Sequence, residues 1–107
     1  MKSAWVYIMS SLSGVLYIGV TSDLDRRVFE HNNSIRSGFA TRYRCNNLVY
    51  VERYQYLTAA IAREKTLKGW SRKRKIALIK QENPGFEDLA AEWGKPIDAA
   101  DNEVGDR

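Results

Sequence analysis

The chain has 107 residues, of which 44% are hydrophobic and 28% are charged, a balance typical of a single globular domain rather than a disordered chain. No apolar run is long enough to cross a membrane, and the N-terminal residues lack the pattern of a secretory signal. One cysteine excludes an intrachain disulfide framework, and with only one histidine beside it a zinc cluster is excluded too, so we expect a reduced, cytoplasmic protein without a membrane partner.

The formal net charge is +4, and it is unevenly distributed along the chain. Residues 94–107 contain four acidic and two basic side chains, so the first 93 residues carry a charge of +6. A basic domain is compatible with a polyanionic partner such as nucleic acid, although many soluble proteins are equally basic. We expect one domain over residues 1–94 and a disordered acidic tail over residues 95–107.

Residues 5–20 contain two runs of aromatic and β-branched residues, separated by the polar break Ser10–Gly14. Each run alternates with a period of two, which favours strands over a helix. The break has the length and composition of a hairpin loop. The sequence therefore predicts a β-hairpin at the start of the domain.

If this hairpin is centred on Leu12, Tyr7 lies opposite Tyr17 and Trp5 lies opposite Gly19. One face of the hairpin is then purely aliphatic, and the other presents two phenols side by side, with Gly19 opening space beside them. We expect the two rings to lie close together and partly exposed in a concave site. From periodicity alone, a cross-strand aromatic contact that only stabilises the sheet is the favoured alternative.

A helix is predicted from Asp23 to Asn32, because Ser22 or Asp23 can cap its first turn. Arg27 and His31 are four residues apart and would share a face at the edge of the core. A guanidinium and an imidazole would thus lie together. The alternatives are a solvated surface arginine and a histidine that bonds the last carbonyls of the helix.

The segment from Asn33 to Asn46 has no clean periodicity. Its arginines alternate with aromatic residues, a combination that suits phosphate contact and base stacking but also an ordinary loop. We slightly favour a nucleic-acid role for the three arginines of this segment, which are Arg36, Arg42 and Arg44.

A third strand is predicted over Leu48–Gln55, followed by a helix over Ala59–Trp70 that Thr58 would cap. Glu64 lies on an otherwise apolar stripe of that helix. A carboxylate in such a position needs a partner or a metal ion if it is buried. The alternative is an ordinary surface pair with Lys68, four residues further along.

A last helix is predicted from Ser71, its cap, to about Gln81, and the sequence Asn83-Pro84-Gly85 should end it. The basic residues at its start oppose the helix macrodipole, which suggests phosphate contact, although a solvated charged face is the alternative. These four consecutive bases are Arg72, Lys73, Arg74 and Lys75. Beyond the helix, we expect Phe86, Leu89 and Trp93 to pack a short helical turn on the core.

Two tripeptides of the hairpin resemble the signature of a known family. Val6-Tyr7-Ile8 and Tyr17-Ile18-Gly19 are similar to the paired motifs of the GIY-YIG nucleases, with valine where the family name has glycine. Arg27, His31 and Glu64 follow in family order and at family-like spacing. The resemblance covers roughly residues 4–93. It is greatest to small single-domain members, which resemble the nuclease domain of the bacterial excision-repair nuclease subunit and so point to DNA repair.

The resemblance implies an α+β fold with a three-stranded antiparallel sheet flanked by helices, in the order ββαβαα that the sequence also predicts. It further implies a metal-dependent endonuclease that hydrolyses phosphodiester bonds in DNA and leaves a 5′-phosphate and a 3′-hydroxyl. Glu64 would be the protein ligand of a Mg²⁺ (or Mn²⁺) cofactor, since Mg²⁺ keeps most of its water. Gly19 and Thr41 match structural positions, and Thr41 could also position a phosphate.

The remaining matched residues would act on the phosphate and the attacking water. Arg27 would bind the phosphate oxygens. Tyr7 would be the general base or the water-orienting group, with a phenol pKa lowered by nearby positive charge, and Tyr17 would orient Tyr7 or the water. His31 could accept or relay the phenolic proton.

Members of the family usually combine this domain with a separate DNA-binding region. We therefore expect a protein partner that supplies specificity, and DNA, including branched or damaged DNA, as the substrate. The alternative is a non-catalytic or partner-dependent nucleic-acid-binding module that uses the basic helix and the Arg36–Arg44 segment. Glu64 discriminates between the two, because a binding module needs no metal carboxylate.

Overall fold

A computed structural model of the protein describes residues 3–32, 44–91 and 93. The predicted order ββαβαα and the α+β class are confirmed over these residues. The elements are strands β1 (Ala4–Ser10), β2 (Leu16–Thr21) and β3 (Asn47–Tyr54), and helices α1 (Leu24–Asn32), α3 (Leu57–Lys68) and α4 (Arg72–Glu82). Within the described part of the chain, no helix is long and apolar enough to span a membrane.

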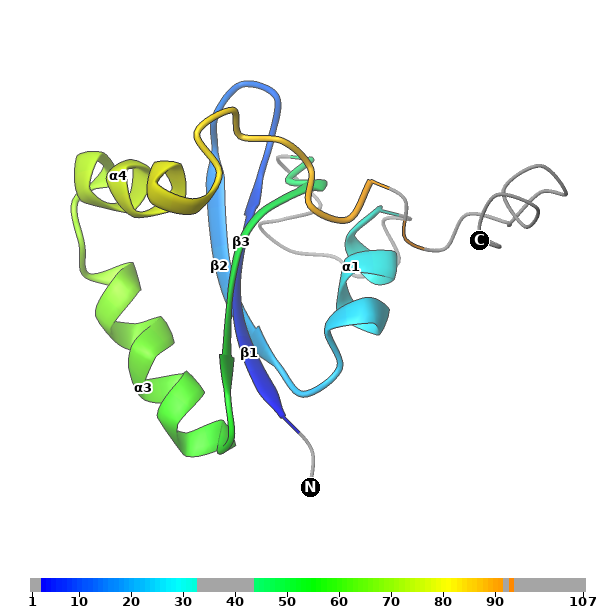
Figure 1. The fold of residues 1–107 in the computed structure, drawn as a ribbon, viewed down its shortest axis with the longest axis vertical. Helices are drawn as coiled ribbons and strands as arrows, with labels where there is room; N and C mark the ends of the chain where they lie inside the picture. The colour runs from blue at the N-terminus through cyan, green and yellow to red at the C-terminus, as the bar shows by residue number, and fades with distance from the viewer. Residues whose placement is uncertain (1–2, 33–43, 92, 94–107) are drawn as a thin grey trace, which may run out of the picture.

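The sheet has the strand order β2-β1-β3, with β1 antiparallel to both neighbours. The strand β1 is therefore central, and β2, which carries Tyr17, is an edge strand. Figure 1 shows the sheet nearly edge-on, with α3 and α4 on one face and α1 on the other. Side chains from both faces of the sheet can thus come together at the outer edge of β2.

The hairpin register differs by two residues from the predicted one. Tyr7 pairs with Gly19 and Met9 pairs with Tyr17. The loop is centred one residue later than expected, because Ser11 N–H donates to the Val15 carbonyl at 2.9 Å and the backbone at Gly14 adopts a φ of +93°. A shift of two residues keeps every side chain on its predicted face, so the division into an aliphatic and an aromatic face survives.

Each face of the sheet has its own core. Val6, Ile8 and Ile18 form the buried aliphatic face that packs against α3 and α4, where Leu67 and Ile79 are fully buried. The opposite face packs against α1. Its buried side chains are Tyr7, Met9, Leu24, Val28, Cys45, Leu48 and Ala90.

Helix ends follow local capping where a cap exists. The Ser71 hydroxyl accepts from Arg74 N–H at 3.2 Å, as predicted for the start of α4. The helix α3, in contrast, begins two residues before the predicted start, with Tyr56 as its N-cap and no side-chain cap bond. Thr58 therefore lies inside the first turn rather than at the cap.

Beyond α4, the chain crosses to the face that α1 covers (Figure 1). The predicted packing of this segment is partly wrong, because Leu89 and Trp93 are exposed and Ala90 is the buried residue. Asn83 anchors the turn: its buried side-chain amide donates to the Val49 carbonyl at 3.1 Å. The turn geometry therefore points Ala90 inward and leaves Leu89 at the surface.

Candidate active site

The Tyr7 ring occupies the space that Gly19 leaves open on the neighbouring strand. A Cβ atom added to Gly19 would lie 2.5 Å from Cζ of Tyr7, so any side chain at that position would overlap the phenol. This close approach is why the glycine of the second tripeptide stands opposite the tyrosine of the first. The predicted partly exposed Tyr7 is wrong, because its side chain is fully buried.

Three rings meet on the α1 face of the sheet. We refer to Tyr7, Tyr17 and His31 as the phenol–imidazole cluster. The ring centroids of Tyr7 and Tyr17 are 6.2 Å apart, and those of Tyr17 and His31 are 5.3 Å apart. The Tyr7 hydroxyl lies 3.3 Å from Nε2 of His31. The tyrosines are thus neighbours, as predicted, but they contact each other diagonally and both contact the imidazole.

The helix α1 supplies the imidazole and a guanidinium from one face. Asp23 caps its start, where Oδ1 accepts from Arg26 N–H at 3.2 Å. Arg27 is partly exposed, and its Nε lies 3.3 Å from Oε1 of Glu30. His31 is buried in the last turn against the phenols. The shared face of Arg27 and His31 therefore borders the cluster, in agreement with their four-residue spacing.

The pKa of Tyr7 lies well above its ordinary value. Burial is the largest cause, and the neighbouring Tyr17 adds to it, whereas the positive charge of Arg27 opposes the shift. The predicted lowering of this pKa is therefore wrong in direction. Desolvation of the phenolate outweighs the attraction of a guanidinium that is itself partly in water.

Glu64 lies on α3, which covers the opposite face of the sheet from α1 (Figure 1). Its side chain is only 15% exposed, and Oε2 lies 2.9 Å from Nζ of Lys68. The sequence left two alternatives, a buried carboxylate that needs a partner or metal ion and a surface pair with Lys68. The structure shows features of both, because the carboxylate is mostly buried and is also paired at i,i+4. The structure gives Glu64 a cationic partner.

A pocket at the edge of the sheet connects the two faces. It has a volume of about 310 Å³ and is lined by Leu16, Tyr17, Ile18, Lys68 and Lys75. Tyr17 comes from the α1 face of β2, and the lysines come from the helices on the other face. We call this the edge pocket. It brings the phenol–imidazole cluster and the Glu64–Lys68 pair to opposite sides of one strand.

The chemistry of Glu64 fits a hydrated divalent cation. Mg²⁺ typically takes one or two carboxylates and keeps several waters, so it needs no dedicated cage of protein ligands. In the described ranges, no group of three or more His, Cys, Asp or Glu side chains could hold a metal ion. The carboxylate of Glu64, 15% exposed, is therefore the donor that such an ion would use here.

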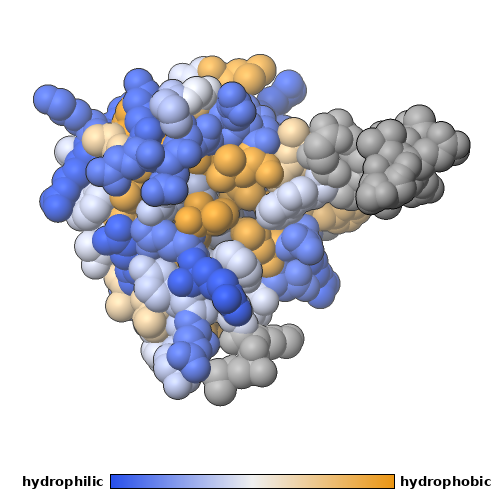
Figure 2. Space-filling model, viewed as in Figure 1, coloured by the Kyte–Doolittle hydropathy of each residue, from blue (hydrophilic) through white to orange (hydrophobic). Residues whose placement is uncertain are grey.

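The basic residues at the start of α4 are exposed, apart from the partly buried Lys75. Hydrophilic side chains project from the surface over this helix in Figure 2. Arg72 lies beside Gly14 of the hairpin loop, and Arg74 stacks 4.0 Å above the centroid of the Trp70 ring. The start of α4 therefore borders the hairpin.

Of the basic residues predicted between the first helix and the third strand, the structure describes only Arg44. Arg44 is exposed, adopts a φ of +56° and lines a different pocket, with the serines of the hairpin loop. Arg36, Thr41 and Arg42 lie outside the described residues. Their roles stay predictions.

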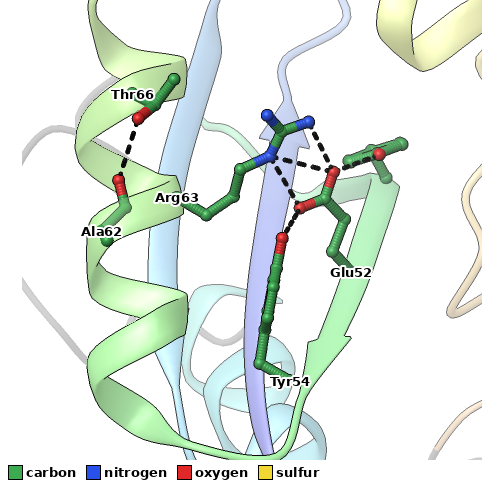
Figure 3. A network of polar contacts seen from close by, with 6 residues as sticks. Glu52, Tyr54, Ala62, Arg63 and Thr66 are labelled. Atoms are coloured by element: carbon green, nitrogen blue, oxygen red, sulfur yellow. Dashed lines mark hydrogen bonds and ion pairs between the residues drawn. The ribbon is translucent and has the colours of Figure 1, made fainter.

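Sequence reasoning missed a network that fixes α3 on the sheet. Glu52 at the end of β3 accepts from Nε and Nη2 of Arg63, both at 3.0 Å (Figure 3). It also accepts from the hydroxyls of Tyr50 and Tyr54. The alternation of Tyr50, Glu52 and Tyr54 along the strand was the available signal, because these three side chains share one face.

Comparison with known proteins agrees with this arrangement. Residues 3–77 match the model of the GIY-YIG catalytic domain. UPF0213 proteins of Staphylococcus aureus strains Mu50 and N315 are each 36% identical over 81 residues, which cover 76% of this chain and 99% of theirs. The solution NMR structure of the UPF0213 protein of Bacillus halodurans, 24% identical, covers 84% of this chain and 97% of its own with a TM-score of 0.52, a likeness of fold alone. The chain belongs to the GIY-YIG catalytic domain family.

Proposed function

We propose that the protein is a metal-dependent endonuclease that hydrolyses phosphodiester bonds in DNA. One observation carries the proposal. In a chain of the GIY-YIG family, the edge pocket is lined by Tyr17 of the phenol–imidazole cluster from one face of the sheet and by Lys68, the partner of Glu64, from the other. A pocket with a phenol and two ammonium groups in its wall is suited to a phosphate with a water beside it.

The polar groups divide into those that hold the phosphate and those that handle the proton. Arg27, partly exposed beside the cluster, would donate to the non-bridging phosphate oxygens. Tyr17, which lines the edge pocket, would orient the attacking water. The water attacks phosphorus and the 3′ oxygen leaves, which yields a 5′-phosphate and a 3′-hydroxyl.

The buried phenol is better suited to positioning than to proton abstraction. Because burial raises its pKa, Tyr7 stays protonated at neutral pH. A neutral phenol oxygen that accepts from Nε2–H of His31, at 3.3 Å, would hold the imidazole in the tautomer whose Nδ1 carries no proton. We therefore assign proton transfer to His31 and Tyr17, and assign Tyr7 to fixing their orientation.

Glu64 would hold a Mg²⁺ or Mn²⁺ ion, which when bound supplies positive charge to stabilise the leaving oxygen. The low exposure of the carboxylate supports this role, since a mostly desolvated carboxylate gains most from a cation. The exposed bases Arg72, Lys73 and Arg74 would contact the DNA backbone outside the site. Such contacts carry no sequence information, so a protein partner would supply specificity. We place this activity in the cytoplasm and in DNA repair.

The second candidate is a nucleic-acid-binding module without catalysis. The observation that favours it is the Glu64–Lys68 ion pair, since a carboxylate that already has a cation needs no metal. The exposed basic start of α4 would then be the whole functional surface. This reading leaves the burial of Tyr7 and His31 against each other without a functional consequence.

A plasmid-nicking assay across Mg²⁺, Mn²⁺ and salt concentrations separates the two. We expect wild type to nick only with a divalent cation, Glu64→Ala to abolish nicking, and Arg27→Ala to reduce the rate by about 10² to 10³ as loss of one preorganised donor does elsewhere. Glu82→Ala removes an exposed glutamate at the end of α4 and should leave the rate unchanged. Equal nicking by wild type and Glu64→Ala would assign the activity to a contaminant. DNA binding without nicking by either protein would favour the binding module.

A further inference from the structure

Lys68 is paired with Glu64 and also lines the edge pocket. Its Nζ lies 2.9 Å from Oε2 of Glu64, while the same side chain lines the edge pocket beside Tyr17 and Lys75. The side chain of Lys68 is 55% exposed and that of Glu64 only 15% exposed. The lysine can therefore move, on a flexible four-carbon stem, while the carboxylate is held in place.

A divalent cation on Glu64 and the ammonium group of Lys68 cannot share the carboxylate without repulsion. Two positive charges a few ångströms apart disfavour each other even in water. Lys68 would have to leave Glu64, and the edge pocket offers the nearest destination, because Lys75 already makes it a place for an anion. A DNA phosphate in that pocket would be the new counter-ion.

Resting on the proposed function, we infer that Lys68 is a displaceable counter-ion of Glu64 that couples metal binding to DNA binding. Without substrate it neutralises the carboxylate and weakens metal binding. With a DNA phosphate seated between Lys68, Lys75 and Tyr17, the lysine leaves Glu64 and the carboxylate becomes available. Lys68 is thus a positioning residue, and the coupling is reciprocal, so that metal also tightens DNA binding.

The test compares Lys68→Met with Lys65→Met. Methionine keeps the aliphatic stem and the helix propensity of lysine. Lys65 is exposed on the same helix and lies outside the residues that line the edge pocket, so it controls for the loss of one positive charge. Circular dichroism melting of both variants verifies that each is folded, and Lys68→Gln provides a second substitution at the same position.

The first readout is Mn²⁺ binding to the free protein, followed by electron paramagnetic resonance. We expect Lys68→Met to bind Mn²⁺ about five-fold more tightly than wild type, and Lys65→Met to bind it as wild type does. The second readout is DNA binding in EDTA, followed by fluorescence anisotropy. Lys68→Met should bind more weakly, with a salt slope reduced by about 1.

The third readout is the coupling itself, measured as the ratio of Mn²⁺ affinities with and without a non-cleavable phosphorothioate DNA. The ratio should fall in Lys68→Met and not in Lys65→Met. Unchanged or weaker Mn²⁺ binding by free Lys68→Met, or an unchanged ratio, would overturn the exchange. Such a Mn²⁺ result overturns only the exchange if wild type still cleaves DNA and Glu64→Ala does not. If cleavage does not depend on Glu64, the proposed function itself is overturned.

Discussion

At the scale of single residues, burial decides which polar groups can change charge. Tyr7 and Tyr17 carry the same phenol, yet Tyr7 is fully buried and Tyr17 lines an open pocket. The pKa of Tyr7 is raised chiefly by desolvation, so that its hydroxyl remains a donor at neutral pH. The tyrosines of the two similar tripeptides thus differ in burial, and for that reason we propose different roles for them.

Tyr7→Phe tests the positioning role of the buried hydroxyl. The ring stays in the core, and the deleted bond to His31 is a long one at 3.3 Å, so the free energy of unfolding should change by no more than about 1 kcal/mol. The nicking rate should fall by about 10²-fold, the low end of what one positioned acid–base group contributes. Tyr56→Phe, at an exposed position, is the matched control. Equal rates for the two variants would remove Tyr7 from the site.

Glu52→Gln tests the network that holds α3. Burial alone would raise the pKa of Glu52, but hydrogen bonds from Arg63, Tyr50 and Tyr54 outweigh it and lower the pKa below its ordinary value. The ionised form therefore stabilises the fold, and the substitution should reduce the free energy of unfolding by about 1–3 kcal/mol at neutral pH. Urea denaturation measures this loss.

The pH dependence of the same variant has a defined sign. A lowered folded-state pKa contributes stability that is complete above the unfolded value of about 4.3 and is lost as the pH falls through the folded value. The stability difference between wild type and Glu52→Gln should therefore shrink below about pH 4, relative to its value at neutral pH. A difference that stays constant down to about pH 3 would show that the ionisation of Glu52 does not stabilise the fold.

At the scale of elements, the first turn of α4 combines an unfavourable helix-dipole interaction with an exposed basic surface. Four bases in the first turn oppose the helix dipole, and no acidic residue offsets them there. The Ser71 cap and the stacking of Arg74 on Trp70 stabilise this end of the helix. The helix therefore presents its basic end beside the hairpin rather than losing that turn.

Lys73→Ala should weaken DNA binding by a similar factor for every DNA sequence and reduce its salt slope by about 1, because the contact is to phosphate. Lys80→Ala removes the same charge from the other end of α4 and should change the slope much less. Fluorescence anisotropy titrations at several salt concentrations measure both. Equal slopes for the two variants would place the DNA elsewhere than at the start of α4.

At the scale of the whole molecule, the candidate site is built around one edge strand. The helices α1 and α3 lie on opposite faces of the sheet (Figure 1). Side chains from the two faces can come together only at an edge of the sheet, and β2 is such an edge strand. Tyr17 and Lys68 meet in the edge pocket for that reason. The proposed function therefore requires an intact sheet between the two helices.

Amide hydrogen exchange should show β1 as the slowest-exchanging element. It hydrogen-bonds to strands on both sides, and its residues from Val6 to Ser10 are all buried. Exchange there requires global unfolding, whereas amides of the edge strand β2 that face outward should exchange through smaller openings. Faster exchange in β1 than in β2 would contradict the central position of β1.

The sequence alone determined the order of elements and the faces of the hairpin. Alternation with a period of two depends only on strand geometry, so it survived a register error of two residues at the loop. The same reasoning placed Arg27 and His31 on one helix face and gave α4 its Ser71 cap, because these are local relations within a few residues. The family motif added the order of the five candidate site residues.

Only the tertiary structure decided burial and pairing between distant elements. The depth of Tyr7 reversed the expected direction of its pKa shift, because desolvation depends on what covers the ring and not on its neighbours in sequence. The same holds for Glu52, whose main partner Arg63 lies on another element, and for Lys68, which spacing joined to Glu64 but which only the folded edge of β2 brings beside Tyr17. Charges and hydrogen bonds act over a few ångströms of space, and the fold sets those distances.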